Sequence, residues 1–400
     1  MQNTLYQMRI AILTSGILPI PAVQGGAVEN LIDFYLAYND QKKLHDITVY
    51  SVANPKTRNH PTLLSDVNHY HYIDTSSIIT KIRRSLYKLS HKKDYYNYFI
   101  EYYFEQAYKH IEKQSYDCII LENRPGYALK LSEGVNSRII LHLHNDLLNN
   151  ESKRHNEVIN CLYKIITVSD YIKSRVCTIQ GTNKVNTVHN GIDLHRFAIH
   201  TQSNINRKSL GLSQNDFILL YSGRINKDKG VSELVDAMLN LKDIPNIKLL
   251  ILGSTFFGDA KNDDDFVKGL KSKSTEIADR ITFTGFIPYT QMPNYLSIAD
   301  IAVIPSIWDD PFPTTVLEAQ AMGLPIITTL RGGSPEEVSQ DNAILLETHE
   351  HFTENLANAI LDLYQHPEKR KAMSKASLER SKLFDKDRYA REFFEAMEIF

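Results

Sequence analysis

The chain has 400 residues, of which 42% are hydrophobic and 23% charged, and its formal net charge is −2. This composition excludes a largely disordered chain and a disulfide-stapled miniature, and the length suits two or three domains. The balanced charge provides no general field for nucleic acid, so no nucleic-acid partner is expected.

Three scattered cysteines, with no metal-ligand or Cys-x-x-Cys spacing, predict a reduced, cytoplasmic protein. The amino-terminal stretch lacks the apolar core and cleavage site of a signal peptide. No window approaches about eighteen uninterrupted apolar residues, so no membrane span is expected.

Short apolar runs rich in Val and Ile alternate with helix-like segments along the chain. Because these runs are apolar on consecutive positions, they favour strands covered on both faces, joined in βαβ units. The expected strands are residues 9–14, 46–52, 117–121, 138–142 and 165–168, then 217–221, 248–252, 281–284, 301–304 and 325–328. Two sets of five predict an α/β protein with two doubly wound domains, whose strand ends imply a cleft between them.

The polar, turn-rich stretch 190–206 marks the division between these domains. We expect an N-terminal domain at 1–195, a C-terminal domain at 196–380, and a terminal helix at 381–400 that packs back on the N-terminal domain. The apolar residues of that helix recur at spacings of three or four, which is typical of an amphipathic helix docked on a core.

The segment 308–319 follows an expected strand and therefore lies at a carboxyl end, where ligands bind in such sheets. Asp310 falls in the loop, and Glu318 in the first turn of a helix expected from Thr315. Unpaired N–H groups at the helix start, together with both carboxylates, suit an anionic or hydroxyl-rich ligand. Alternatively, Thr315-x-x-Glu318 is a capping box in which Glu318 only bonds the backbone.

A basic loop, residues 222–230, follows the strand expected at 217–221. Gly223 permits close backbone approach, and Arg224 and Lys229 bring a planar fork and a compact charge that suit phosphate oxygens. The alternative is a solvated basic loop balanced by Asp228.

The paired Gly25 and Gly26 precede a helix expected at 28–38, where backbone N–H groups could face a phosphate. No G-x-G-x-x-G follows any expected strand, which disfavours a nicotinamide dehydrogenase. Paired glycines are also common in plain turns.

His142 and His144 point to one face of the strand at 138–142. His144 could bond a sugar hydroxyl or phosphate, or it could be a buried histidine with its hydrogen bonds satisfied. A metal site with Asp146 is disfavoured because no third ligand follows at useful spacing.

Together these motifs resemble the nucleotide-sugar glycosyltransferases of family 4, which are retaining enzymes with the GT-B fold. The E-x7-E signature of the family falls on Asp310 and Glu318, and its Arg-x4-Lys pair on Arg224 and Lys229. Further matching segments are the glycine-rich loop at 25–26, the histidine motif at 144–146, the linker entry at 189–193 and the stretch 332–337.

The resemblance implies that Arg224 and Lys229 hold the donor diphosphate, that Glu318 binds ribose hydroxyls, and that Asp310 binds the donor sugar. It implies catalytic roles for Arg224, Lys229, Asp310, Glu318 and His144. The donor-binding residues that it implies are Gly25, Gly26, Gly223, Arg224, Lys229, Asp310, Phe312, Thr314, Thr315 and Glu318. It implies no metal or other cofactor. Two positions depart from the family. Asp310 replaces the usual Glu, and Pro313 replaces a usual glycine and has no N–H.

The implied reaction is transfer, with retention, of a hexose-type sugar from a nucleotide sugar, UDP being the commonest choice, to a glycan or lipid-linked acceptor in surface polysaccharide synthesis. The alternatives are a GT-B sugar-nucleotide epimerase and a catalytically silent nucleotide-sugar-binding partner subunit.

Residues 81–93 carry Lys and Arg without any acid, and residues 95–104 are rich in aromatic side chains. A basic helix beside an aromatic one suits anionic lipid headgroups, so 81–104 predicts peripheral contact with the inner face of the cell membrane. The alternative is a solvated face next to a packed helix.

Overall fold

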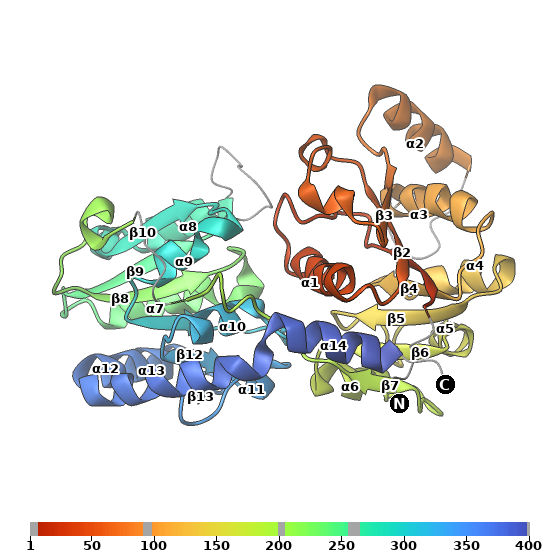
Figure 1. Ribbon diagram of the computed structural model, residues 1–400. Helices are drawn as coiled ribbons and strands as arrows, with labels where there is room; N and C mark the ends of the chain where they lie inside the picture. The colour runs from red at the N-terminus through yellow and green to blue at the C-terminus, as the bar shows by residue number, and fades with distance from the viewer. Residues whose placement is uncertain (1–6, 91–97, 199–204, 255–264, 398–400) are drawn as a thin grey trace. The chain divides into compact units, whose positions relative to one another are not determined.

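A computed structural model describes residues 7–90, 98–198, 205–254 and 265–397, which divide between two compact units. Unit 1 falls within Met1–His189 and Asp387–Phe400, and unit 2 is Asn190–Lys386. Figure 1 shows that each unit is a sheet with helices on its faces. The second unit thus begins at Asn190 and ends at Lys386, against the 196–380 expected from the sequence.

Unit 1 contains a parallel sheet in the order β3-β2-β1-β4-β5-β6-β7. Its chain order reverses between β1 and β4, which pair side by side. The strands are β1 (Arg9–Leu13), β2 (Asp46–Val52), β3 (Asn68–Ile73), β4 (Cys118–Glu122), β5 (Arg138–Leu143), β6 (Lys164–Thr167) and β7 (Val185–Thr187). The helices are α1 (Ala27–Lys42), α2 (Ile78–Ser90), α3 (Tyr98–Ile111), α4 (Tyr127–Gly134), α5 (His155–Cys161), α6 (Asp170–Val176) and α14 (Lys386–Met397).

Unit 2 contains a second parallel sheet in the order β10-β9-β8-β11-β12-β13, which reverses between β8 and β11. The strands are β8 (Phe217–Ser222), β9 (Ile247–Leu252), β10 (Ile281–Gly285), β11 (Ile301–Ile304), β12 (Ile326–Thr329) and β13 (Ala343–Leu346). The helices are α7 (Val231–Asn240), α8 (Asp265–Lys273), α9 (Met292–Leu296), α10 (Thr314–Ala321), α11 (Ser334–Glu337), α12 (Phe352–Gln365) and α13 (Pro367–Ser381).

All ten strands expected from the sequence are present, and the predicted fold class of two doubly wound α/β units is confirmed. The central strands are recognisable because both of their faces are buried, as in β1, where Ile10, Ile12 and Leu13 are inaccessible to solvent. Strands β3, β7 and β13 were not expected from the sequence, because they lie at sheet edges and are polar or very short.

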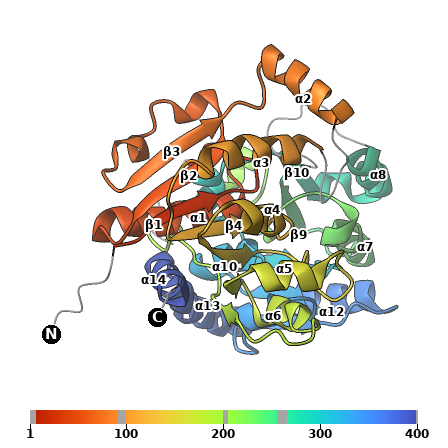
Figure 2. The same ribbon diagram turned by 90° about the vertical axis from the view of Figure 1, so that its right-hand side faces the viewer.

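The last helix, α14, completes the core of unit 1 (Figures 1 and 2). Its apolar stripe packs on α1, and the Phe393 ring stacks on the Tyr35 ring with centroids 4.3 Å apart and planes 5° from parallel. Phe394 and Met397 are buried beside them. A segment that ends the described chain is therefore as much a part of this core as β1.

No helix in the described ranges has both the length and the apolar character that a membrane span requires.

We predict that Phe393→Ala lowers the free energy of unfolding by about 3–5 kcal/mol, because it empties a ring-sized space in a buried cluster. Urea denaturation followed by circular dichroism measures the change. Arg391→Ala, on the exposed side of the same helix, is the matched control and should cost about 0.5 kcal/mol or less. Equal costs for the two variants would contradict the role given to α14.

Candidate functional site

The reversal of strand order in unit 2 brings two loops together at the carboxyl edge of the sheet. One loop follows β8 and contains Gly223, Arg224 and Lys229, and the other follows β11 and contains Asp310. In open α/β sheets, ligands bind where the strand order reverses. The two motifs that the sequence analysis singled out therefore lie at this position of unit 2.

Gly230 allows these two loops to approach each other. Its φ is 68°, in the left-handed region, and a Cβ there would overlap the carbonyl oxygen of Pro305. Next to it, the Asp228 carbonyl accepts hydrogen bonds from the amides of Ile307 (3.0 Å) and Trp308 (3.2 Å). The backbone of the loop after β8 thus sets the position of the loop after β11.

Lys229 and Asp310 form an ion pair between the two loops. The Lys229 ammonium also lies 5.4 Å from the centre of the Trp308 ring, within the range of a cation–π contact. Both side chains are largely buried, so their charges act with little screening by solvent. The structure thus brings together two of the predicted site residues.

A third loop, after β12, holds Asp310 from the other side. Gly332 has a φ of 56°, and a Cβ there would collide with the backbone of Asp309 and Asp310. The amide of Gly333 donates a hydrogen bond of 2.8 Å to the Asp310 carbonyl. The Asp310 carboxylate is therefore presented from a loop fixed by backbone on two sides.

Helix α10 begins at Thr314, with Pro313 as its N-cap and no side-chain capping hydrogen bond. The alternative in which Glu318 closes a capping box with Thr315 is therefore wrong. Glu318 lies in the second turn and is buried, and burial raises its pKa to about 8. Burial is the main cause that raises the pKa of Tyr289, and the charge of the nearby Glu318 is the second.

The remaining predicted residues of unit 2 are placed by backbone contacts. The Tyr221 hydroxyl donates to the Arg224 carbonyl at 2.6 Å, and the Arg224 side chain is exposed. Phe312 is buried, and its carbonyl accepts a hydrogen bond of 3.1 Å from the side-chain amide of Asn190. Thr314 and Thr315 form the first turn of α10.

Glu337, the last residue of α11, was not among the site residues expected from the sequence. Its carboxyl group is fully buried, and neither oxygen has a hydrogen-bond partner among the described residues. Burial, then the charges of Asp310 and Glu336, raise its pKa well above the ordinary value. Glu337 therefore lies in the electrostatic surroundings of Asp310. Its place in the motif stretch 332–337 was the only sequence signal for it.

In unit 1, Gly25 and Gly26 both have positive φ, at 76° and 107°, just before α1. A Cβ at Gly26 would collide with the carboxyl group of Glu29, which is buried in the first turn of the helix. Burial raises the pKa of Glu29 to about 7. A carboxyl group from the helix thus lies directly against the predicted phosphate loop, and nothing in the sequence indicated this contact.

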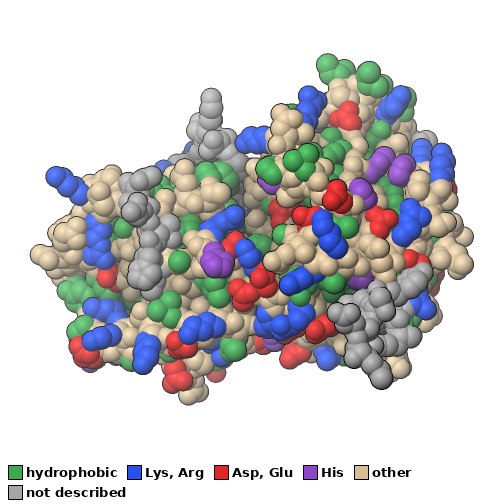
Figure 3. Space-filling model, viewed as in Figure 1, with side chains coloured by type: hydrophobic (Ala, Val, Ile, Leu, Met, Phe, Trp, Pro, Cys, Tyr) green, Lys and Arg blue, Asp and Glu red, His purple; other side chains and the backbone are tan. Residues whose placement is uncertain are grey.

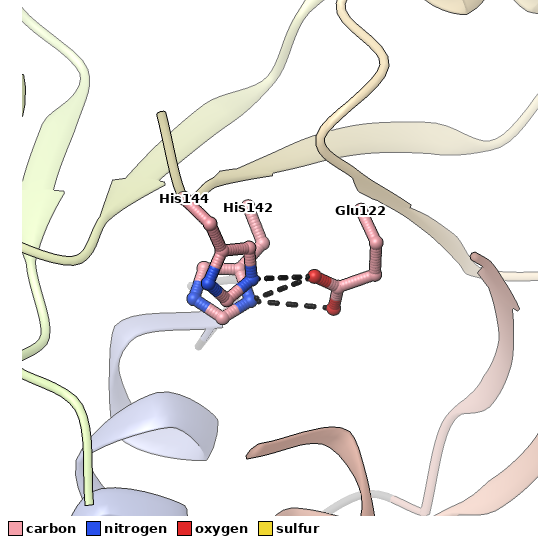
Figure 4. A group of neighbouring side chains, drawn as sticks. All are labelled: Glu122, His142 and His144. Atoms are coloured by element: carbon pink, nitrogen blue, oxygen red, sulfur yellow. Dashed lines mark hydrogen bonds and ion pairs between the residues drawn. The ribbon is translucent and has the colours of Figure 1, made fainter. Parts of the chain in front are cut away.

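His144 lies in a buried network with His142 and Glu122 (Figure 4). Its Nε2 is 2.8 Å from Glu122 Oε2, and His142 Nδ1 is 3.2 Å from Glu122 Oε1. The Tyr35 hydroxyl donates to the same carboxylate at 2.9 Å. Burial alone would raise the pKa of Glu122, but the two histidines outweigh it and hold that pKa below its ordinary value.

Burial, and then the adjacent His142, lower the pKa of His144 to about 4, so this imidazole is neutral near pH 7. One ring nitrogen of each histidine and a Glu122 oxygen lie within 4.8 Å of one another, a grouping that could hold a metal ion. No third ligand follows the two histidines at useful spacing in the sequence, but Glu122 reaches them from the neighbouring strand β4. The hydrogen bonds already described satisfy the carboxylate without an ion.

A cavity of about 390 Å³ in unit 2 lies away from these motifs. Its lining includes Asp300, Gly323 and Arg370 and none of the predicted site residues. Asp300 precedes β11 and Gly323 precedes β12, so the cavity lies at the amino ends of the strands. Ligands of such sheets bind at the opposite edge.

The sequence and the structure of this chain are both similar to those of known proteins. Residues 202–380 match the family Glycosyl transferases group 1. The chain is 28% identical over 384 residues to spore coat protein SA of Bacillus subtilis, covering 92% of this chain and 93% of that protein. It is 27% identical over 172 residues, or 42% of each chain, to the UDP-Gal:alpha-D-GlcNAc-diphosphoundecaprenol alpha-1,3-galactosyltransferase of Escherichia coli. The structure of Anabaena Alr3699/HepE in complex with UDP-glucose has a TM-score of 0.73 at 21% identity, covering 98% of this chain and 99% of that one.

The two doubly wound units, together with the relatives and the solved structure just described, give the class of protein: the chain is a glycosyltransferase with the GT-B fold. Within that class, residues 202–380 match the model of the family glycosyl transferases group 1. The resemblance drawn from the motifs is confirmed at this level, and family 4 is consistent with it.

We predict that Gly230→Ala destabilises the protein more than Gly211→Ala does. Both glycines are left-handed, with φ of 68° and 73°, so both variants lose about 1 kcal/mol to backbone strain. A Cβ at Gly211 meets no atom within 4 Å, whereas one at Gly230 overlaps the Pro305 carbonyl. We therefore expect Gly230→Ala to cost about 2 kcal/mol more in urea denaturation. Equal losses would show that the loops can separate freely.

We also predict a pH-dependent effect of Glu318→Gln on stability. Because the folded pKa of Glu318 is about 8 and its ordinary value is 4.5, the folded chain binds an extra proton between these values. The resulting stabilisation is complete below the ordinary pKa and is lost as the pH rises through the folded pKa. From about pH 6 to about pH 9, the wild type should lose roughly 2–3 kcal/mol more than Glu318→Gln. Parallel stability curves for the two proteins would contradict the raised pKa.

Proposed function

We propose that this glycosyltransferase moves a hexose from a UDP-sugar, with retention of anomeric configuration, to a hydroxyl of a glycan or lipid-linked glycan in surface polysaccharide synthesis. The Anabaena structure supports a UDP-sugar donor, since that protein is in complex with UDP-glucose. The name of the E. coli relative supports a lipid-linked acceptor, since it specifies a diphosphoundecaprenol.

The observation that carries the proposal is the Lys229–Asp310 pair at the switch point of unit 2. A nucleoside diphosphate needs cations on its phosphate oxygens, and a sugar needs acceptors for its hydroxyl groups. Lys229, with the exposed Arg224 on the same loop, supplies the first, and Asp310 supplies the second. Fixed cations at this edge also stabilise the negative charge that grows on the leaving diphosphate.

The proposed reaction breaks the bond between the anomeric carbon and the diphosphate oxygen, and forms a bond from that carbon to the acceptor oxygen. The acceptor attacks on the face from which the diphosphate leaves, so the configuration is retained. The proton of the acceptor hydroxyl passes to an oxygen of the departing phosphate. In this scheme Lys229 and Arg224 provide the positive charge, and no metal ion is needed.

Glu318 fits the role of ribose partner. Its carboxyl group is buried, and with a pKa of about 8 it is largely protonated at pH 7. A protonated carboxyl group can donate one hydrogen bond and accept others, which matches a pair of neighbouring hydroxyl groups. The proposed roles of Gly25, Gly26 and His144 toward the phosphates and the sugar remain predictions from the resemblance.

We predict that Lys229→Ala slows sugar transfer at least a hundredfold while weakening donor binding much less, because the ammonium acts mainly on the charge of the leaving group. Thermal-shift titration across nucleotide sugars measures donor binding and identifies the donor, and labelled-sugar transfer measures the rate. Proton NMR of the product reads its anomeric configuration.

The matched control is Lys227→Ala, an exposed lysine two positions away on the same loop, which should leave rate and binding unchanged. A normal transfer rate in Lys229→Ala would overturn the phosphate assignment. An inverted product would overturn retention and leave the donor site standing.

A further inference from the structure

Helix α2 exposes an apolar stripe along its whole length. Five large apolar side chains, Ile78, Ile79, Ile82, Leu86 and Leu89, have exposed fractions between 58% and 84%. At about 100° per residue, their positions fall within one sector of about 100° around the helix. Figure 3 shows hydrophobic side chains gathered at the top of the view, where Figure 1 places α2.

The opposite side of α2 attaches the helix to unit 1. The Tyr87 ring meets the Tyr102 ring of α3 edge to face, with centroids 6.0 Å apart. Thr80 is buried, and its hydroxyl donates to Asp74 at 2.9 Å. Because Tyr87 and Thr80 lie about 130° and about 150° from the centre of the stripe, the stripe faces away from the side that is attached to unit 1. An amphipathic helix normally presents its apolar side to the core, and α2 does the reverse.

Positive charge accompanies the stripe, and negative charge does not. Residues 75–93 contain six Lys and Arg and no Asp or Glu. Lys81 and Arg83 are exposed and lie on the two flanks of the stripe, about 60° and about 40° from its edges. An apolar stripe with cations on both sides is typical of a helix that lies in the headgroup layer of an anionic membrane.

The structure corrects the expectation that aromatic residues of 95–104 contact lipid. Tyr102, Tyr103 and Phe104 are buried in unit 1, so the packed-helix alternative is right for them. Lys92, Lys93, Tyr95 and Tyr96 lie outside the described residues. The apolar surface comes instead from the Ile and Leu residues of α2, which the sequence analysis had considered only for its charges.

We propose that α2 binds the surface of an anionic lipid bilayer, with its Ile and Leu stripe among the acyl chains and Lys81 and Arg83 at the headgroups. A second copy of this chain fits the stripe less well, because a symmetric contact would bring the two sets of cations together without any acid to offset them. The inference rests on the proposed function only for the purpose of membrane binding, which is access to a lipid-linked acceptor.

Vesicle flotation tests the proposal with the whole protein. We expect binding to vesicles of mixed phosphatidylglycerol and phosphatidylcholine, little binding to phosphatidylcholine alone, and weaker binding as salt rises from about 50 mM to about 500 mM. Ile82→Glu/Leu86→Glu should reduce the partition coefficient onto anionic vesicles by about a hundredfold or more. Lys81→Gln/Arg83→Gln should reduce it about tenfold to thirtyfold. Leu64→Glu is the matched control, since Leu64 is 85% exposed in the same unit but outside α2, and it should bind like the wild type.

Two results would overturn the proposal. The first is that the wild-type protein does not bind anionic vesicles, or that Ile82→Glu/Leu86→Glu binds them as well as the wild type does. The second is that sedimentation shows a dimer for the wild type and a monomer for that variant, while vesicle binding does not change. The stripe would then be a protein interface. Donor binding by thermal shift should be unchanged in all of these variants, so loss of vesicle binding is distinguishable from failure of the proposed transfer reaction.

Discussion

The close approach of loop backbones at the carboxyl edge of the second sheet is the constraint on which the candidate site depends. The Pro305 carbonyl occupies the space that a side chain on Gly230 would need, and the Asp310 backbone does the same at Gly332. Without these contacts, the loop after β8 would not lie against the loop after β11. Lys229 and Asp310 come from segments 81 positions apart in the chain, and they meet because glycine leaves room for the backbones between them.

The environments of the buried acids differ in a way that burial alone does not explain. Glu122 and Glu318 are both almost inaccessible to solvent, yet the pKa of one is lowered and that of the other is raised. Glu122 receives hydrogen bonds from a tyrosine and two histidines, and these stabilise its charge. For Glu318 the one cause is burial, which favours the neutral form. The charged form of the first acid is therefore stabilised by its neighbours in unit 1, whereas burial favours the neutral form of the second.

The sequence predicts those parts of the fold and of the candidate site that depend on interactions between residues close together in the chain. The central strands and the motif loops could be predicted, because two-sided burial produces continuous apolar runs and because the motifs lie at strand ends. The partnership of Glu122 with two histidines could not be predicted, since it joins neighbouring strands 20 and 22 positions apart in the chain. The outward direction of the α2 stripe was also inaccessible, because periodicity identifies an amphipathic helix but not the side on which it is covered.

The place of α14 in the first unit has a consequence for the order in which the molecule is made. Unit 1 is assembled from two stretches of chain that flank the whole of unit 2. During synthesis from the ribosome, unit 2 can fold as one continuous stretch, whereas the earlier unit must keep the Tyr35 face of α1 uncovered until Phe393 has emerged. The first half of the polypeptide therefore depends longest on protection from aggregation, although it is translated first.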